Sequence, residues 1–324
     1  KNISFVMWLY AGITSLSFKY SNYKKVIVTK LKQRSQSAGN FLMTSYVFNE
    51  RTSETLRHKS NDSENLKKIS IHVPTHLRPA NELDFGHYLA GLIDGDGHFS
   101  SASQLVIVFS ELDASLAYFI KEKIGYGNVR KVKNKKAIIL VISNRVGILK
   151  ILNLINGKIR SENKLHQITK NILSNSYFTN LTNFTGNSDL DLNNYWLAGF
   201  SDADASFQIK LITRNNKTEV RLNFQIDQKR NDLLILIKNF LGGNIGYSKS
   251  QDTYYYNSTS FGSAKKVINY FDKFHMLSSK HVNYLKWRKA YIIIQDKNHL
   301  IDKGLLKIIN LKKTMNRNNS ETMD

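Results

Sequence analysis

The most constraining feature of this sequence is a short pattern that occurs twice. The first copy, residues 88–99, reads Tyr-Leu-Ala-Gly-Leu-Ile-Asp-Gly-Asp-Gly-His-Phe, and the second, residues 195–207, reads Tyr-Trp-Leu-Ala-Gly-Phe-Ser-Asp-Ala-Asp-Ala-Ser-Phe. In both copies a run of apolar and small residues ends in two aspartates and passes directly into a strand-like segment. The last aspartates, Asp96 and Asp204, stand 108 positions apart. Because this period is far longer than a solenoid unit, it predicts two similar half-domains.

The aspartates stand at the unfavourable end of the expected helices. A helix C-terminus carries partial negative charge and unpaired carbonyl oxygens, which favour cations. Small residues one turn earlier, at 90–91 and 198–199, would let the two helix backbones pack closely and bring Asp96 near Asp204. Two carboxylates at that separation repel each other unless a cation lies between them. The alternative is that the aspartates only end their helices and accept hydrogen bonds from nearby amides.

The composition narrows the class of partner. The chain has 324 residues with 41% hydrophobic residues, enough to bury one or two cores. Its formal net charge of +22 favours a polyanion, for which nucleic acid is the default. The charge is spread along the whole chain, whereas a membrane surface would call for an amphipathic basic helix. The absence of cysteine excludes disulfides and thiolate zinc sites.

Residues 89–97 and 197–205 resemble the motif of the LAGLIDADG homing endonucleases and their intron maturase relatives. The resemblance covers roughly residues 84–295. It implies an α+β fold of two pseudo-symmetric αββαββα half-domains, each with an antiparallel sheet that forms a DNA-binding saddle, and with the motif helices packed at the centre.

Composition and pattern divide the chain into five parts. The first 80 residues hold 13 Lys or Arg against 4 Asp or Glu, and Pro74 and Pro79 mark the entry into a folded unit. The expected parts are a basic, largely disordered N-terminal extension (1–80), a first LAGLIDADG half-domain (81–178), a linker (179–192), a second half-domain (193–300) and a basic C-terminal tail (301–324).

The resemblance implies an intron-encoded, site-specific double-strand DNA endonuclease that hydrolyses phosphodiester bonds. Its metal would be Mg²⁺, with Mn²⁺ as a substitute, bound by Asp96 and Asp204, while Asp94 and Asp202 would be structural or would lie in the outer shell of the metal. The alternative is an RNA-binding maturase that assists group I intron splicing, with or without cleavage. Retention of both acids favours cleavage, because RNA binding alone does not need them. The implied partners are duplex DNA at the intron insertion site and group I intron RNA, without a membrane, for a monomer in mitochondria.

Further residues are expected to complete the catalytic site. Gln228 has the parity of the buried face of its strand yet is polar, so it should point toward the motif helices. Alignment of the helices that end at Gly125 and Gly242 places Glu111 in the matching position of the first half. In the family a basic residue near the start of a later helix often joins the site, which suggests Lys280 in the second half and either Lys158 or Lys164 in the first.

Polar residues that alternate with apolar ones predict a nucleic-acid face. Strand-forming segments of the second half carry amide and guanidinium groups able to reach base edges in the major groove. These candidates are Gln208, Lys210, Arg214, Arg221, Asn223 and Gln225. In the first half Val106 and Val108 occupy the equivalent places, so base readout is expected mainly from the second half. The first half would grip the DNA backbone through Arg130, Lys131 and Lys133.

Overall fold

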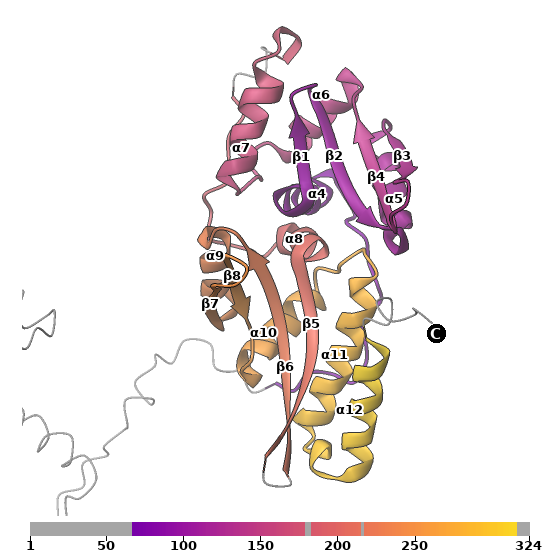
Figure 1. The fold of residues 1–324 in the computed structure, drawn as a ribbon, viewed down its shortest axis with the longest axis vertical. Helices are drawn as coiled ribbons and strands as arrows, with labels where there is room; N and C mark the ends of the chain where they lie inside the picture. The colour runs from indigo at the N-terminus through magenta and orange to yellow at the C-terminus, as the bar shows by residue number, and fades with distance from the viewer. Residues whose placement is uncertain (1–66, 179–182, 215–216, 316–324) are drawn as a thin grey trace, which may run out of the picture. The chain divides into compact units, whose positions relative to one another are not determined.

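The computed structural model of this chain describes residues 67–178, 183–214 and 217–315, all within one compact unit, Leu66–Asp324 (Figure 1). The first half consists of α4 (Glu82–Asp96), β1 (Gly97–Ser100), β2 (Gln104–Ser110), η2 (Glu111–Asp113), α5 (Ala114–Ile124), β3 (Asn128–Lys131), β4 (Ala137–Ile142), α6 (Arg145–Ile155), α7 (Glu162–Ile168), η3 (Thr169–Leu173) and η4 (Ser176–Phe178). The second half consists of α8 (Trp196–Asp204), β5 (Ala205–Arg214), β6 (Lys217–Gln228), α9 (Asp232–Leu241), β7 (Asn244–Ser248), β8 (Thr253–Asn257), α10 (Phe261–Phe271), α11 (Lys280–Gln295), η5 (Asn298–Leu300) and α12 (Asp302–Thr314).

The two halves repeat the same sheet topology. The first sheet has the order β1-β2-β4-β3 and the second the order β5-β6-β8-β7, and all neighbouring strands are antiparallel. The predicted α+β fold with two pseudo-symmetric halves is therefore confirmed. The halves differ in their first hairpin, because β5 and β6 have 10 and 12 residues while β1 and β2 have 4 and 7.

One face of each sheet packs against helices and forms the core, while the opposite face, called the outer face below, does not. Burial alternates along the strands because successive side chains of a strand point to opposite faces. The core-facing residues include Phe99, Leu105, Ile107 and Leu140 in the first sheet and Phe207, Leu222, Phe224 and Ile226 in the second.

The motif helices α4 and α8 touch through their backbones, in the centre of Figure 1. A Cβ atom added to Gly91 would lie 1.9 Å from the carbonyl oxygen of Trp196, and one added to Gly199 would lie 2.0 Å from that of Tyr88. Any side chain at either glycine would therefore force the helices apart. This reciprocal contact places the C-terminal ends of both helices side by side.

Residues assigned to the two ends of the chain are partly ordered. Ile69 exchanges two backbone hydrogen bonds with the side chain of Gln295, at 2.8 and 3.1 Å, and Arg288 donates to the carbonyl of His72 at 3.1 Å. Ile69 and His72, predicted as part of a disordered extension, are thus bound to α11 of the second half, and His76 and Leu77 hydrogen-bond to Met276 and His275 just before α11. Residues 1–66 lie outside the described part. In the predicted C-terminal tail, α12 is a helix that packs on α11. In the three described ranges, no helix has both the length and the apolar character needed to cross a membrane.

Candidate metal and nucleic-acid site

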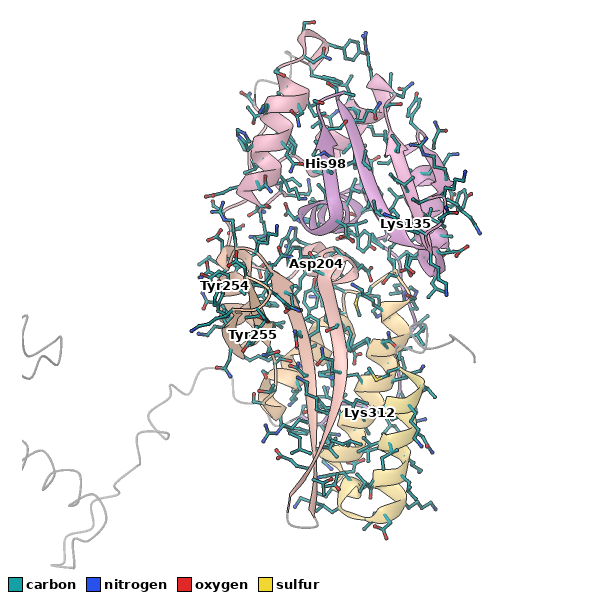
Figure 2. All side chains as sticks on the ribbon, viewed as in Figure 1. His98, Lys135, Asp204, Tyr254, Tyr255 and Lys312 are labelled. Carbon is teal, nitrogen blue, oxygen red and sulfur yellow. The ribbon has the colours of Figure 1, made fainter. Side chains whose placement is uncertain are left out.

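Asp96 and Asp204 are the last residues of α4 and α8. A Cβ atom on the neighbouring Gly95 would lie 2.3 Å from the Cβ of Ala203 and 2.8 Å from Oδ2 of Asp204, so the two helix ends are in direct contact. Figure 2 shows Asp204 between the two halves. Each acid is followed at once by the first strand of its own sheet, which places both sheets next to the same pair of carboxylates.

The electrostatics of this pair disfavour two bare negative charges. Burial and then the charge of Asp96 raise the pKa of Asp204 to about 6, against the opposing effects of Lys280, a hydrogen bond from Gln228, and Lys164. Asp96 is exposed, but the surrounding protein still removes part of its hydration and raises its pKa. The charges of Lys280 and Lys164 act in the opposite direction and lower that pKa. A bound cation would relieve this repulsion.

The donor set fits a hard divalent cation that shares its coordination with substrate. Among the residues of the described ranges, no group of three or more His, Cys, Asp or Glu could enclose a metal. A transition-metal cage is therefore not built from these side chains. Mg²⁺ is commonly held by only one or two carboxylates, with phosphate oxygens and water as its other ligands. Asp96 and Asp204 provide that minimal pair.

Two lysines offset the unfavourable helix ends. Neither motif helix has a basic residue in its own last turn. Instead Lys280 of α11 donates to the carbonyl of Ala203 at 2.6 Å, and Lys164 of α7 donates to that of Gly97 at 2.5 Å. The pKa of both lysines is lowered, because the effect of burial exceeds the opposite effect of the nearby aspartates. Both ammonium groups therefore lie beside the acid pair, one from each half.

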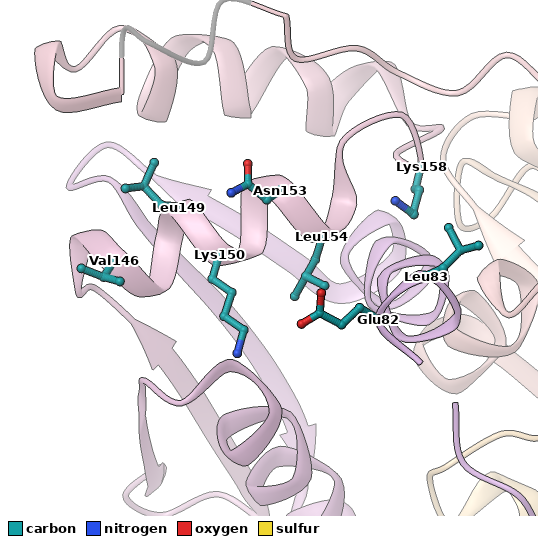
Figure 3. A pocket seen from close by; sticks show the side chains of 8 residues that line it. All are labelled: Glu82, Leu83, Val146, Leu149, Lys150, Asn153, Leu154 and Lys158. Carbon is teal, nitrogen blue, oxygen red and sulfur yellow. The ribbon is translucent and has the colours of Figure 1, made fainter. Parts of the chain in front are cut away.

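The expectation that Lys158 serves the site is contradicted. Lys158 lines a pocket of about 450 Å³ with Glu82 and Leu83, at the N-terminal end of α4 (Figure 3). The Cε atom of Lys158 lies 3.2 Å from a Cβ atom added to Gly86, ten residues before Asp96, so the two are separated by about 15 Å along the helix. Of the two candidates, Lys164 is the one that the fold brings to the acids.

Gln228 stands where its strand parity places it, at the end of β6, and donates from Nε2 to Oδ2 of Asp204 at 2.6 Å. Glu111 does not hold the matching position. The pairs Gly97 with Ile107 and Ala205 with Ile226 are equivalent, so the register matches Gln228 with buried Phe109. The first half has one more residue before α5, and α5 is one residue longer than α9, so the alignment from the helix ends was wrong by two positions.

Glu111 instead pairs with Lys131 at 2.5 Å, and both side chains are exposed. Lys131 stands opposite buried Ile138, so it leaves the sheet on the core side, unlike Arg130, which stands opposite Ile139 on the outer face. Lys133 is exposed in the β3–β4 turn. The three predicted backbone-gripping residues therefore do not share one face.

The first aspartate of each motif links the two halves. Buried Asp94 accepts from the amides of Arg160 and Ser161, at 2.8 and 3.1 Å, and from the indole of Trp196 in the other motif helix, at 2.8 Å. Asp202 is buried in the same way: its partners are the amides of Leu277 and Ser278, the hydroxyl of Ser278, and the hydroxyl of Tyr88 across the interface. Tyr88 and Trp196 occupy the same place in the two sequence copies. The sequence held a signal for these contacts, because both copies of the motif have an aromatic residue with a polar hydrogen-bond donor at this position.

The outer face of the second sheet is polar. Cross-strand pairing puts five of the six candidates on it, namely Gln208, Lys210, Arg221, Asn223 and Gln225. Their amides form a network in which Gln208, Asn223 and Gln225 hydrogen-bond to one another at 3.2 to 3.4 Å. Asn223 is buried within it. Asp227, not predicted, accepts from Gln225 at 3.0 Å at the end nearest the acids. The side chain of Arg214, the last residue of β5, is outside the described part.

Sequence comparison gives clear relatives. Residues 197–291 match the model of the LAGLIDADG endonuclease family. The chain is 58% identical over 320 residues to an uncharacterized cox1 intron-2 protein of 37.2 kDa from Schizosaccharomyces pombe, covering 94% of this chain and 96% of that one. It is 27% identical to a probable intron-encoded endonuclease 4 of Neurospora crassa, over 72% of this chain and 44% of that one. It is also 27% identical to the intron-encoded RNA maturase bI4 of Saccharomyces cerevisiae, over 72% and 34%. The chain thus spans less than half of the last two.

Solved structures share the fold. The meganuclease I-SmaMI bound to DNA superposes with a TM-score of 0.57 at 22% identity, covering 72% of this chain and 99% of that chain. The same meganuclease bound to uncleaved DNA in the presence of calcium ions gives a TM-score of 0.52. The repeated motif, the paired sheets and the full-length relative agree. This chain belongs to the LAGLIDADG endonuclease family.

Proposed function

We propose that this chain is a site-specific endonuclease that cuts double-stranded DNA at the insertion site of its intron, with Mg²⁺ held between Asp96 and Asp204. The meeting of these two acids at the contacting ends of α4 and α8 carries the proposal. Two carboxylates in mutual repulsion, each at a helix C-terminus, are unfavourable unless a cation is bound. Relatives named as intron-encoded endonucleases support it.

The residues of the chain have distinct parts in this reaction. Hydrolysis joins a water oxygen to phosphorus and breaks the bond to the leaving sugar oxygen, which takes up a proton. A divalent cation bound at the acid pair, Mg²⁺ or Mn²⁺ in its place, would supply an activated water and neutralise phosphate charge. Asp96 and Asp204 would hold this cation, and Gln228 fixes the Asp204 carboxylate by its hydrogen bond. Lys164 and Lys280 add positive charge beside the scissile phosphate.

A maturase that binds group I intron RNA is the second candidate. A relative named as an RNA maturase and the net charge of +22 favour it. The two functions can reside in one chain. The name of the cox1 intron-2 relative supports a mitochondrial origin. Since both halves of the site come from one chain, we propose that it acts as a monomer.

Cleavage of the intron junction tests the proposal. The purified chain is incubated with duplex DNA that spans the insertion site of the parent gene, with Mg²⁺ or EDTA, beside the Asp96→Asn variant. Both strands should be cut only by the unchanged protein and only with Mg²⁺. Absence of a metal-dependent cut, together with tight binding of the intron RNA, would instead support the maturase.

A further inference from the structure

The outer face of the first sheet is aliphatic, unlike that of the second. Register pairs Val106 with Val141 and Val108 with Ile139, and their neighbours in sequence are the buried core residues. The four aliphatic side chains therefore lie on the outer face, and Val108 is 47% exposed. This group of four is called the aliphatic face below.

The two sheets can be compared position by position. Because Ile107 is equivalent to Ile226, the aliphatic face replaces a polar set in the second sheet, and Val106, Val108, Ile139 and Val141 match Gln225, Asp227, Tyr255 and Asn257. Both outer faces begin beside the same acid pair. The polar outer face of the second sheet, proposed to bind DNA, thus has an apolar counterpart in the first sheet.

The charge around the aliphatic face indicates a polyanion. Arg130 shares the outer face, and Lys133, Lys135 and Lys136 are exposed in the adjacent β3–β4 turn. Lys135 is labelled beside this sheet in Figure 2. Such a basic rim suits phosphates. The aliphatic side chains themselves can neither donate nor accept a hydrogen bond to a base edge.

One base in DNA offers an apolar group in the major groove: thymine, through its C5-methyl. RNA carries uracil without this methyl, and its deep, narrow major groove excludes side chains. We propose that the aliphatic face recognises thymine methyl groups in the half of the target that the first sheet covers. The inference rests on the proposed DNA-binding function and gives the first half a base preference of its own.

Replacing thymine by deoxyuridine tests the proposal, because it removes only the methyl and keeps the base pair. Affinity is measured by fluorescence anisotropy in Ca²⁺, separately for duplexes substituted in each half of the target. Loss of a buried methyl should weaken binding about fourfold per contacted thymine. The effect should appear in one half only. In that half, Val108→Asn should abolish the difference between thymine and deoxyuridine.

The control is Val146→Asn, which changes a valine of similar exposure, 50%, in α6 away from the sheet. It should keep the full deoxyuridine effect. Equal affinity for thymine and deoxyuridine duplexes would overturn the inference even if the junction is cut, so the two proposals fail separately. Self-association of the chain that Val108→Asn abolishes, without a deoxyuridine effect, would also overturn it and assign the face to a second copy.

Discussion

Asp204 is held where a charged carboxylate is unfavourable. Its pKa rises from 3.8 to about 6 through burial and the charge of Asp96. Between these values the folded state binds more protons than the unfolded chain, so the free energy of unfolding falls as pH rises through this window. Above about pH 6 the penalty is constant in the absence of metal. The ionised Asp204 thus lowers the free energy of unfolding, and a bound cation would offset this loss.

Asp204→Asn should therefore stabilise the metal-free protein while it abolishes cleavage. The neutral amide keeps the shape of the side chain and removes the repulsion, which we expect to add about 1–2 kcal/mol to the free energy of unfolding at pH 7.5. Thermal denaturation in EDTA from pH 4 to pH 8 measures it. The gain should vanish near pH 4, and a variant that is less stable at every pH would contradict this electrostatic account.

Lys164 and Lys158 form a matched pair for testing the basic residue of the first half. Both are lysines near one motif helix, but only Lys164 lies at its acidic end. Lys164→Ala should slow cleavage about 100-fold, as does loss of a charge-stabilising donor. Lys158→Ala should leave the rate near that of the unchanged protein. Single-turnover cleavage rates at saturating Mg²⁺ measure both, and equal losses would remove the distinction.

At the scale of elements, the motif helices are joined by more than their glycines. Tyr88 of α4 donates to Asp202 of the other half at 2.7 Å, and Trp196 of α8 donates to Asp94 at 2.8 Å. Each of these acids also binds the amides that precede α7 or α11, the helices that carry Lys164 and Lys280. The same contacts therefore fix the helix interface and the positions of the two lysines.

Tyr88→Phe should weaken this interface without changing its packing volume. The variant removes one buried hydrogen bond to a carboxylate, which costs about 1.5–3 kcal/mol. Urea denaturation measures the change in the free energy of unfolding. Tyr118→Phe in α5, where the ring is 55% exposed, is the control and should change stability little. Equal stability of the two variants would show that the hydroxyl of Tyr88 contributes nothing.

Features set by local sequence pattern could be predicted, whereas features set by tertiary contacts could not. The repeated motif predicted both central helices, and its small residues predicted the close approach that brings Asp96 near Asp204. Strand parity placed Gln228. The prediction for Glu111 failed because one extra residue before α5 and one extra residue within α5 shift the alignment by two positions, and neither leaves a trace in hydrophobic periodicity. The prediction for Lys158 failed because the sequence does not show which end of α4 the loop between α6 and α7 contacts.

At the scale of the whole described unit, two unequal halves share one site. The second half has the long hairpin and the polar outer face, and the first has short strands and the aliphatic face. Pseudo-symmetry is retained where the acids, glycines and interface hydrogen bonds must match. It is lost on the outer faces, which are polar in the second sheet and aliphatic in the first.

The central claim is that one metal site is built jointly by both halves. Isothermal titration calorimetry of Ca²⁺ into the complex with the junction duplex tests it directly, with Glu82→Gln, an exposed acid at the far end of α4, as control. Asp96→Asn and Asp204→Asn should each remove the binding that the unchanged protein and the control show. Retention of full Ca²⁺ affinity by either variant would contradict a shared site.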